Sequence, residues 1–130
     1  MVENTATIRV RYKETDQMQV VYYSNYLVWF EVARTELFRE RGHLYSRIEK
    51  ELGLRLMVVE AQCRYLKPAK YDDLIDVDCR LSKIGASSLV FEYIVKRGED
   101  TLAEGKTVHV FTDANAKPKR MPDALRKALE

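Results

Sequence analysis

The stretch YKETDQMQVVYYSNYLVWFEVART, residues 12–35, holds one acid, Asp16, ahead of a dense run of aromatic and aliphatic residues. A helical pattern begins at Ser24 and continues to Arg41, and its first half carries a single charged residue, Glu31. A helix that is apolar around most of its circumference must be covered on most sides. We therefore expect the N-terminal half of this helix to lie at the centre of the fold.

Both ends of this predicted helix carry residue types that helix termini favour. Ser24 or Asn25 can cap the N-terminus with a side-chain oxygen. Gly42 can adopt the left-handed conformation that commonly follows the last helical turn. The sequence therefore predicts one long helix over residues 24–41.

Most of the remaining chain has apolar residues at every second position, a pattern typical of half-buried antiparallel strands. It predicts strands at about residues 57–65, 75–81, 89–95 and 101–112, with an earlier strand at residues 5–12. Gly85 and Gly98 stand where short hairpin connections are needed, so we expect the four later strands to form a meander. In the first of these strands one face is predicted to hold Met57, Val59, Ala61, Cys63 and Tyr65.

The order of elements is one strand, one long helix, four strands and a closing helix at residues 121–130. The economical way to bury a single apolar helix is to wrap a single sheet around it. We expect an α+β fold with a five-stranded antiparallel sheet, forming one domain over residues 1–130. One sheet leaves part of such a helix uncovered, which predicts at least a homodimer.

The composition is that of an ordinary folded protein, with 46% apolar and 32% charged residues. A formal net charge of +2 argues against a dedicated nucleic-acid binder. The N-terminus lacks a secretory signal pattern, and no apolar run approaches the roughly 18 residues needed to cross a bilayer, so we expect a cytoplasmic protein without membrane insertion. Cys63 and Cys79 lie in strand-like segments, where free thiols are favoured over a disulfide.

Asp16 has two interpretations. In the first it is a turn residue, because aspartate between a strand and a helix often bonds its own backbone. In the second its carboxylate lies near the first turn of the buried helix, where unpaired N–H groups could polarise a substrate carbonyl. A carboxylate beside such donors suits attack on an acyl group, directly or through water. Spacing alone favours the turn.

Other catalytic signatures are missing from the sequence. There is no G-x-S-x-G, H-E-x-x-H, cysteine cluster, phosphate-binding glycine loop or dinucleotide fingerprint. His109 is interpreted as a structural histidine in a strand, and His43 as a residue that follows the helix end. We expect chemistry that needs no metal and no organic cofactor.

Basic residues recur in the second half of the chain. Most could be ordinary solvated charges, but several of them together could hold the phosphates of a nucleotide-tailed acyl carrier such as coenzyme A. The residues concerned are Lys67, Lys70, Lys83, Lys117, Lys119 and Arg120.

The segment RVRYKETDQMQVVYYSNYLVWFEVARTELFRERG resembles the signature region of the hotdog-fold acyl-CoA thioesterases of the 4-hydroxybenzoyl-CoA thioesterase class, which include short-chain enzymes associated with the Tol-Pal system. The similarity continues through YLKPAKYDDLIDV and KIGASSLVFEYIV to KPKRMPDALRKAL, so it covers nearly the whole chain. It implies a hotdog fold and hydrolysis of an acyl-CoA thioester to a free acid and coenzyme A. The T-D, V-V-Y, N-Y and E-x-A-R-T pattern reverses the preference for Asp16 as a turn residue.

The resemblance also implies roles for individual residues. The family's catalytic aspartate matches Asp16, and its carbonyl-polarising backbone N–H matches the main chain of Tyr23. Many members have glycine just before the V-V pair, where this sequence has Gln19, and that side chain could narrow the acyl pocket or oppose a glycine-only conformation. Residues expected to contact the substrate are Gln19, Tyr22, Tyr26, Lys67, Lys83, Ser87 and Arg120.

Members of this family form dimers, commonly paired into tetramers, with active sites at the dimer interface, so the resemblance implies a homodimer paired into a homotetramer. It also implies that the pantetheine arm of acyl-CoA passes the turn at residues 82–88 while basic side chains meet the phosphates. Whether Asp16 acts as nucleophile or general base stays open.

Two alternatives stay open as well, and a third is disfavoured. The substrate carrier could be acyl-carrier protein rather than coenzyme A, because a basic patch could serve either. The domain could bind acyl-CoA without hydrolysing it. A hydratase or dehydratase on the same fold is disfavoured, since that chemistry needs a second acid–base group and no well-placed histidine accompanies Asp16.

Overall fold

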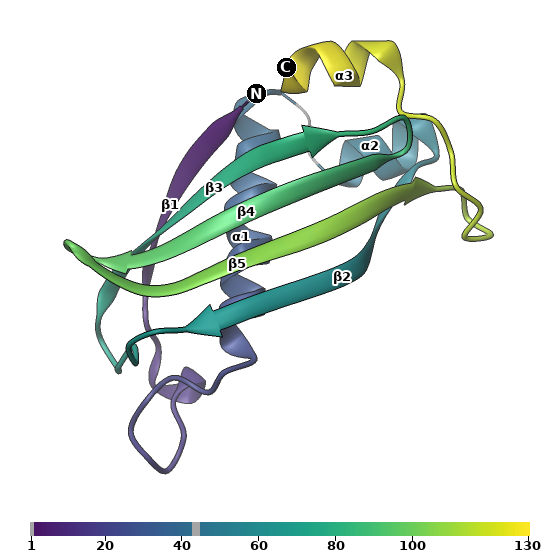
Figure 1. The fold of residues 1–130 in the computed structure, drawn as a ribbon. Helices are drawn as coiled ribbons and strands as arrows, with labels where there is room; N and C mark the ends of the chain where they lie inside the picture. The colour runs from purple at the N-terminus through teal and green to yellow at the C-terminus, as the bar shows by residue number, and fades with distance from the viewer. Residues whose placement is uncertain (1, 43–44) are drawn as a thin grey trace.

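The computed structural model describes residues 2–42 and 45–130, and helix α1, Asn25–Glu40, lies at its centre (Figure 1). This agrees with the helix predicted at residues 24–41. The face turned toward the sheet is fully buried, and the buried apolar residues of the helix are Tyr26, Trp29, Phe30, Ala33, Leu37 and Phe38. The predicted position at the core is confirmed.

The sequence predicted the C-terminal end of α1 correctly but not the cap at its N-terminus. Ser24 occupies the N-cap position, but neither its side chain nor that of Asn25 caps the helix, so the predicted capping bond is wrong. The Asn25 side-chain amide instead donates to the backbone carbonyl of Glu14 at 2.9 Å. At the other end Gly42 has φ +78°, as predicted for the residue after a helix.

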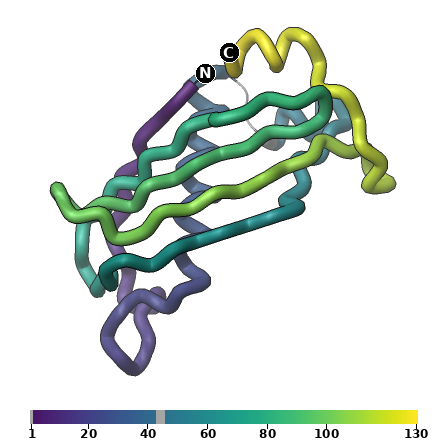
Figure 2. The backbone as a smooth tube through the Cα atoms, in the orientation of Figure 1, coloured from purple at the N-terminus to yellow at the C-terminus, as the bar shows by residue number. Residues whose placement is uncertain are grey.

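One five-stranded antiparallel sheet curves around this helix, as predicted (Figure 2). Its strands are β1 (Glu3–Arg9), β2 (Arg55–Tyr65), β3 (Leu74–Ile84), β4 (Ser88–Arg97) and β5 (Asp100–Thr112), and their order in the sheet is β1-β3-β4-β5-β2. The predicted meander holds for β3, β4 and β5 but is wrong for β2, which pairs with β5. The connection at residues 66–73 spans the end of the sheet instead of forming a hairpin.

Strand β2 also departs from simple alternation. Its register against β5 shifts between Val58 and Glu60, so Val59 bulges out of the ladder. As a result Val58, rather than Met57 or Val59, shares a sheet face with Ala61. A bulge adds one residue to one strand and reverses the side-chain pattern beyond it, which is why the predicted face is wrong for the first half of β2.

Three shorter elements complete the chain. A 3-10 helix, Tyr12–Glu14, replaces the end of the first strand predicted to reach residue 12. Helix α2, Tyr45–Leu52, was not predicted, although Ile48 and Leu52 have helical spacing and Ile48 is buried. Helix α3, Asp123–Leu129, confirms the closing helix and packs Leu125 and Leu129 into the core. Its last turn lies beside the chain start, because the Val2 N–H donates to the Leu129 carbonyl.

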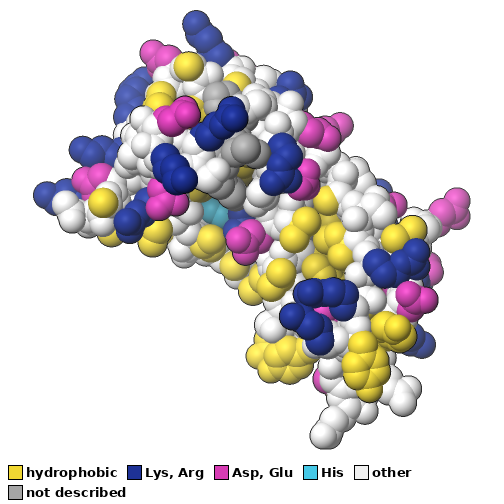
Figure 3. All heavy atoms as spheres, turned by 180° about the vertical axis from the view of Figure 1, so that it is seen from behind, with side chains coloured by type: hydrophobic (Ala, Val, Ile, Leu, Met, Phe, Trp, Pro, Cys, Tyr) yellow, Lys and Arg dark blue, Asp and Glu magenta, His cyan; other side chains and the backbone are white. Residues whose placement is uncertain are grey.

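An apolar surface stays exposed on the side of the molecule that carries α1 (Figure 3). On α1 it includes Leu27, Val28 and Val32, and on β2 it includes Met57, Val58 and Val59. Both sheet faces of β2 are largely exposed, and β2 is an edge strand whose outer row of backbone groups pairs with no other strand of the described chain. Among the described residues no helix is long and apolar enough to cross a membrane.

Candidate functional site

Asp16 lies in a tight hairpin between β1 and α1. Thr15 and Val21 form an antiparallel bridge, the Asp16 N–H donates to the Val20 carbonyl at 2.9 Å, and the Met18 N–H donates to Asp16 Oδ1 at 2.8 Å. The turn interpretation of Asp16 is therefore correct as a description of its local structure. Within the described chain only one carboxylate oxygen of Asp16 has a hydrogen-bond donor, and the residue is half-buried, so the other oxygen can face a ligand.

At the start of α1, two backbone N–H groups differ from their neighbours in having no acceptor among the described residues. The N–H groups of Tyr22, Asn25 and Tyr26 each donate to a carbonyl of the chain. Those of Tyr23 and Ser24 have no acceptor among the residues described. Unpaired N–H groups at a helix start carry partial positive charge and bind developing oxyanions.

The backbone at Gln19 has φ +66°, in the left-handed region that favours glycine. The sequence raised the possibility that a side chain here would oppose such a conformation. The chain adopts it nevertheless, with the Gln19 N–H bonded to the Asp16 carbonyl at 3.0 Å. The exposed Gln19 side chain therefore projects from the turn that carries Asp16.

Tyrosines surround the start of α1. Tyr22 and Tyr23 are exposed, with ring centroids 4.6 Å apart, whereas Tyr26 is buried and its hydroxyl accepts from the Ala69 N–H at 3.2 Å. The Tyr65 hydroxyl donates to the Tyr23 carbonyl at 3.0 Å and so ties β2 to the helix start. Burial raises the pKa of Tyr65, with a further contribution from Cys63, and burial also raises the pKa of Tyr26. Both phenols stay neutral near pH 7 and can act as hydrogen-bond donors.

Glu14 is a buried residue of this region that the sequence analysis missed. Its carboxylate accepts from the Arg11 N–H at 2.8 Å and from the Trp29 indole N–H at 2.9 Å. Its carbonyl accepts from the Tyr22 N–H and from the Asn25 side chain. The signal in the sequence was weak, because Trp29 follows fifteen residues later.

The predicted substrate-binding residues form two groups at opposite ends of the sheet. Gln19, Tyr22 and Tyr26 lie with Asp16 at the end where β1 finishes and β3 begins, and the 66–73 connection that holds Lys67 reaches the same end through a bridge between Val20 and Lys70. Lys67 itself pairs with Asp100 at 2.9 Å.

The second group consists of Lys83, Ser87 and Arg120, and it lies at the β3–β4 turn beside α3 (Figure 1). The Ser87 carbonyl accepts from the Phe111 N–H, and the Met121 N–H donates to the Ala86 carbonyl, so the segment with Arg120 packs against this turn. One chain does not bring the two groups together.

His109 is buried in the core, as its structural interpretation predicts, and it belongs to a polar cluster. Its Nε2 and the Tyr93 hydroxyl lie 2.7 and 2.6 Å from Thr107 Oγ1, whereas its Nδ1 has no partner in the described chain. Burial and then the Arg34 guanidinium lower its pKa to about 3. Cys63 and Cys79 are free thiols, as predicted. His43 lies outside the described residues.

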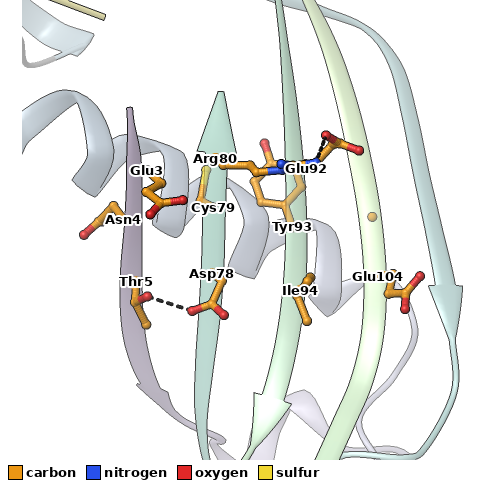
Figure 4. A pocket seen from close by; sticks show the side chains of 11 residues that line it. Glu3, Asn4, Thr5, Asp78, Cys79, Arg80, Glu92, Tyr93, Ile94 and Glu104 are labelled. Atoms are coloured by element: carbon orange, nitrogen blue, oxygen red, sulfur yellow. Dashed lines mark hydrogen bonds and ion pairs between the residues drawn. The ribbon is translucent and has the colours of Figure 1, made fainter. Parts of the chain in front are cut away.

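A hollow of about 800 Å³ lies on the outer face of the sheet, away from α1 (Figure 4). None of the predicted site residues lines it. Several of its polar side chains are already engaged: Arg80 pairs with Glu92 at 2.8 Å, and Asp78 pairs with Lys96 at 2.8 Å and accepts from the Thr5 hydroxyl at 2.7 Å. We therefore place the candidate active site at the Asp16 turn and not in this hollow.

Comparison with known proteins identifies the family and the fold. Residues 10–129 match the model of the thioesterase-like superfamily. The acyl-CoA thioester hydrolase YbgC of Escherichia coli O157:H7 is 31% identical over 123 residues, covering 91% of this chain and 89% of the relative.

Solved structures are similar over nearly the full chain. The hypothetical protein TT1821 from Thermus thermophilus has a TM-score of 0.92 and 36% identity, covering 98% of this chain and 95% of its own. The DHNA-CoA thioesterase from Staphylococcus aureus has a TM-score of 0.93 and 28% identity, covering 98% of this chain and 89% of its own. The chain therefore has the hotdog fold and belongs to the thioesterase-like superfamily.

Proposed function

We propose that this protein is an acyl-CoA thioesterase, which hydrolyses a thioester to a free acid and coenzyme A. The observation that carries the proposal is that a half-buried carboxylate, Asp16, shares one short turn with the N–H groups of Tyr23 and Ser24, which have no acceptor among the described residues. The antiparallel bridge between Thr15 and Val21 holds these groups on either side of one short loop. The names of the relatives support the same activity.

In the proposed reaction the N–H of Tyr23, with that of Ser24, binds the thioester carbonyl oxygen as it gains negative charge. Asp16 either attacks the carbonyl carbon or takes a proton from the water that attacks it. A carbon–oxygen bond forms, the carbon–sulfur bond breaks, and the thiolate leaves and takes a proton from water. If Asp16 is the nucleophile, the product of this step is an acyl–aspartyl anhydride, and a water molecule then hydrolyses it to release the free acid and restore the carboxylate. Removing one such N–H donor typically costs about 10²–10³ in kcat, so these donors matter as much as the carboxylate.

A two-fold dimer accounts for the separation of the two substrate-binding groups. Tyr65 at the end of β2 lies beside Tyr23, whereas Arg55 at its start pairs with Thr112, near the Ser87 turn. Antiparallel pairing of two β2 edges therefore brings the Asp16 turn of one chain toward the Ser87 turn of its partner. The exposed apolar residues of α1 and β2 lie along the same edge and become covered. We propose that two such dimers form a homotetramer.

The test is thiol release from short, long and aromatic acyl-CoAs by the wild type and by Asp16→Asn, with the fold and assembly of both checked by circular dichroism and light scattering. We expect hydrolysis by the wild type and a loss of about 10³-fold or more in the variant. The best acyl group is then compared on coenzyme A and on acyl-carrier protein. Tight binding of acyl-CoA without turnover by the wild type would support a non-catalytic domain, and equal rates in both proteins would reduce Asp16 to a turn residue.

A further inference from the structure

We propose that Glu14 is a positioning residue for the reaction, which fixes the Asp16 turn against the start of α1. The inference rests on the proposed thioesterase function and assigns a role to a residue two positions before the candidate catalytic acid. Glu14 is 3% exposed, although it lies in a short 3-10 helix beside exposed neighbours. A carboxylate this deeply buried needs specific partners, because burial without hydrogen bonds is costly.

The two carboxylate oxygens of Glu14 have different partners. Oε1 accepts from the Arg11 backbone N–H at 2.8 Å, with Arg11 Nε at 3.5 Å, and so closes the 3-10 turn. Oε2 accepts from Trp29 Nε1 at 2.9 Å, and Trp29 is a fully buried residue of α1. The side chain therefore joins the turn to the rigid central helix.

The backbone of the same residue is held as well. The Glu14 carbonyl accepts from the Tyr22 N–H at 2.8 Å and from the Asn25 side-chain amide at 2.9 Å. Tyr22 directly precedes the proposed oxyanion donor Tyr23, and Asp16 follows Glu14 by two residues. A displacement of Glu14 is therefore transmitted to both sides of the reacting centre.

The geometry requires a carboxylate and not merely a polar side chain. Both partners of the carboxylate are N–H donors, so both of its oxygens must accept. Glutamine has nearly the same shape but only one acceptor oxygen, and its amide N–H₂ would meet either Arg11 N–H or Trp29 Nε1–H. Glu14→Gln therefore creates a donor facing a donor in a buried place.

The first measurement is the steady-state kinetics of Glu14→Gln. We expect kcat to fall by about 10–100-fold with KM changed less than about twofold, because a misplacement near 1 Å can cost about 10²-fold in rate. The acyl-CoA contacts predicted from the sequence do not include Glu14, so binding is expected to survive. A kcat within about twofold of the wild type would overturn the proposal.

A second substitution distinguishes positioning from general stability. Trp29→Phe removes the indole N–H, so in Glu14→Gln/Trp29→Phe the amide oxygen can accept from Arg11 while the N–H₂ faces a ring. We expect the double variant to recover at least about fivefold in kcat over Glu14→Gln, although it loses further core packing and melts lower. A role in stability alone predicts that kcat and melting temperature fall together.

Trp29 also supplies a readout that does not depend on activity, because it is the only tryptophan of the chain. Its indole N–H gives a single resolved signal in a ¹H–¹⁵N spectrum. In Glu14→Gln this signal should shift and exchange faster with solvent, and the amide signals of Tyr23 and Ser24 should move with it. In the double variant the two amide signals should return toward their wild-type positions.

These readouts separate failure of the inference from failure of the proposed function. If the wild type hydrolyses no thioester, the proposed function fails, and the Tyr23 and Ser24 signals alone decide whether Glu14 positions the turn. Unchanged signals in Glu14→Gln overturn the inference in either case. If Glu14→Gln does not fold, Trp29→Phe alone must move the same amide signals. Val77→Ala, a core truncation in the middle of β3 away from both groups of predicted site residues, is the stability control and should keep its kcat.

Discussion

At the scale of single residues, the turn that carries Asp16 depends on a left-handed residue that is not glycine. Gln19 has φ +66°, which costs an L-residue about 1–2 kcal/mol, while glycine adds about 0.5–1 kcal/mol of unfolded-state entropy to be lost. The two effects nearly cancel. We therefore expect Gln19→Gly to leave the free energy of unfolding within about 1 kcal/mol and Gln19→Val to lower it by about 2 kcal/mol. Urea unfolding of the three proteins measures this, and equal stability of Gln19→Val would refute a strained turn.

His109 should make the stability of the protein depend on pH. Burial and then Arg34 lower its pKa from 6.5 to about 3 in the folded state. As pH falls, His109 is protonated in the unfolded chain before it is protonated in the folded protein. The stabilisation that depends on the neutral imidazole is therefore complete above pH 6.5, and the free energy of unfolding decreases as pH falls toward 3. The expected slope is about 1.4 kcal/mol per pH unit over that window.

His109→Gln is the matched variant, because its amide nitrogen can replace Nε2 beside Thr107 without titrating. The test compares urea unfolding of both proteins at pH 8, 6, 5 and 4. The difference in free energy of unfolding between the wild type and the variant should change with pH below 6.5 and stay constant above it. A constant difference throughout would mean that His109 is protonated equally in both states.

How far the site could be predicted from sequence differs between Asp16 and Glu14. Spacing alone correctly indicated that Asp16 is a turn residue, and only the family resemblance pointed to a catalytic role, which stays a prediction. Glu14 stands two residues earlier, but its importance comes from Trp29, which the fold brings to 2.9 Å from its carboxylate. A local pattern shows which acids are present and gives no information on which of them is buried.

At the scale of elements, Gly105 determines how closely α1 approaches the sheet. A Cβ built at this position would lie 2.3 Å from Phe30 Cε2 and 2.9 Å from the Gln62 carbonyl oxygen. Gly105→Ala should therefore lower the free energy of unfolding by about 3 kcal/mol through overpacking. Thermal and urea unfolding measure the loss.

Two comparisons make this prediction specific to the α1–β5 contact. Gly98→Ala has left-handed backbone but open space around its Cβ, so it should cost only about 1 kcal/mol. Phe30→Leu combined with Gly105→Ala should be less destabilising than the sum of the two single changes, because the smaller side chain makes room for the methyl group. If the two losses in free energy of unfolding simply added, the strain caused by Gly105→Ala would not lie at its contact with Phe30.

The elements that the sequence predicted well are those whose pattern is set by burial against the helix. In β4 the predicted inner face, Leu89, Phe91, Tyr93 and Val95, is buried without exception. In β2 the alternation failed because the Val59 bulge reverses it, and the pairing with β5 depends on how a long connection crosses the sheet. Neither the bulge nor the strand order leaves a local signal in the sequence.

At the scale of the whole molecule, the proposed active site needs two chains. The Asp16 turn and the Arg120 segment lie at opposite ends of one sheet. In the dimer that we propose, antiparallel pairing of two β2 edges brings the turn of one chain toward the Arg120 segment of the other. A chain with a defective Asp16 and a chain with a defective Arg120 should therefore form one intact site when they pair in a mixed dimer. Asp16→Asn removes the carboxylate, and Arg120→Glu should weaken coenzyme A binding, so that each protein alone has low activity at low substrate concentration.

Equal amounts of the two variants are unfolded, mixed and refolded together. Random pairing makes half of the dimers mixed, and each mixed dimer holds one site with an intact Asp16 from one chain and an intact Arg120 from its partner. We expect recovery of about a quarter of the wild-type activity, against near zero when the variants are refolded separately and mixed afterwards. If both groups came from the same chain, every site in a mixed dimer would carry one defect, and co-refolding would recover nothing. Val28→Asp on the exposed face of α1 should abolish the recovery, because a charge there prevents the two chains from meeting while the fold of each tolerates it.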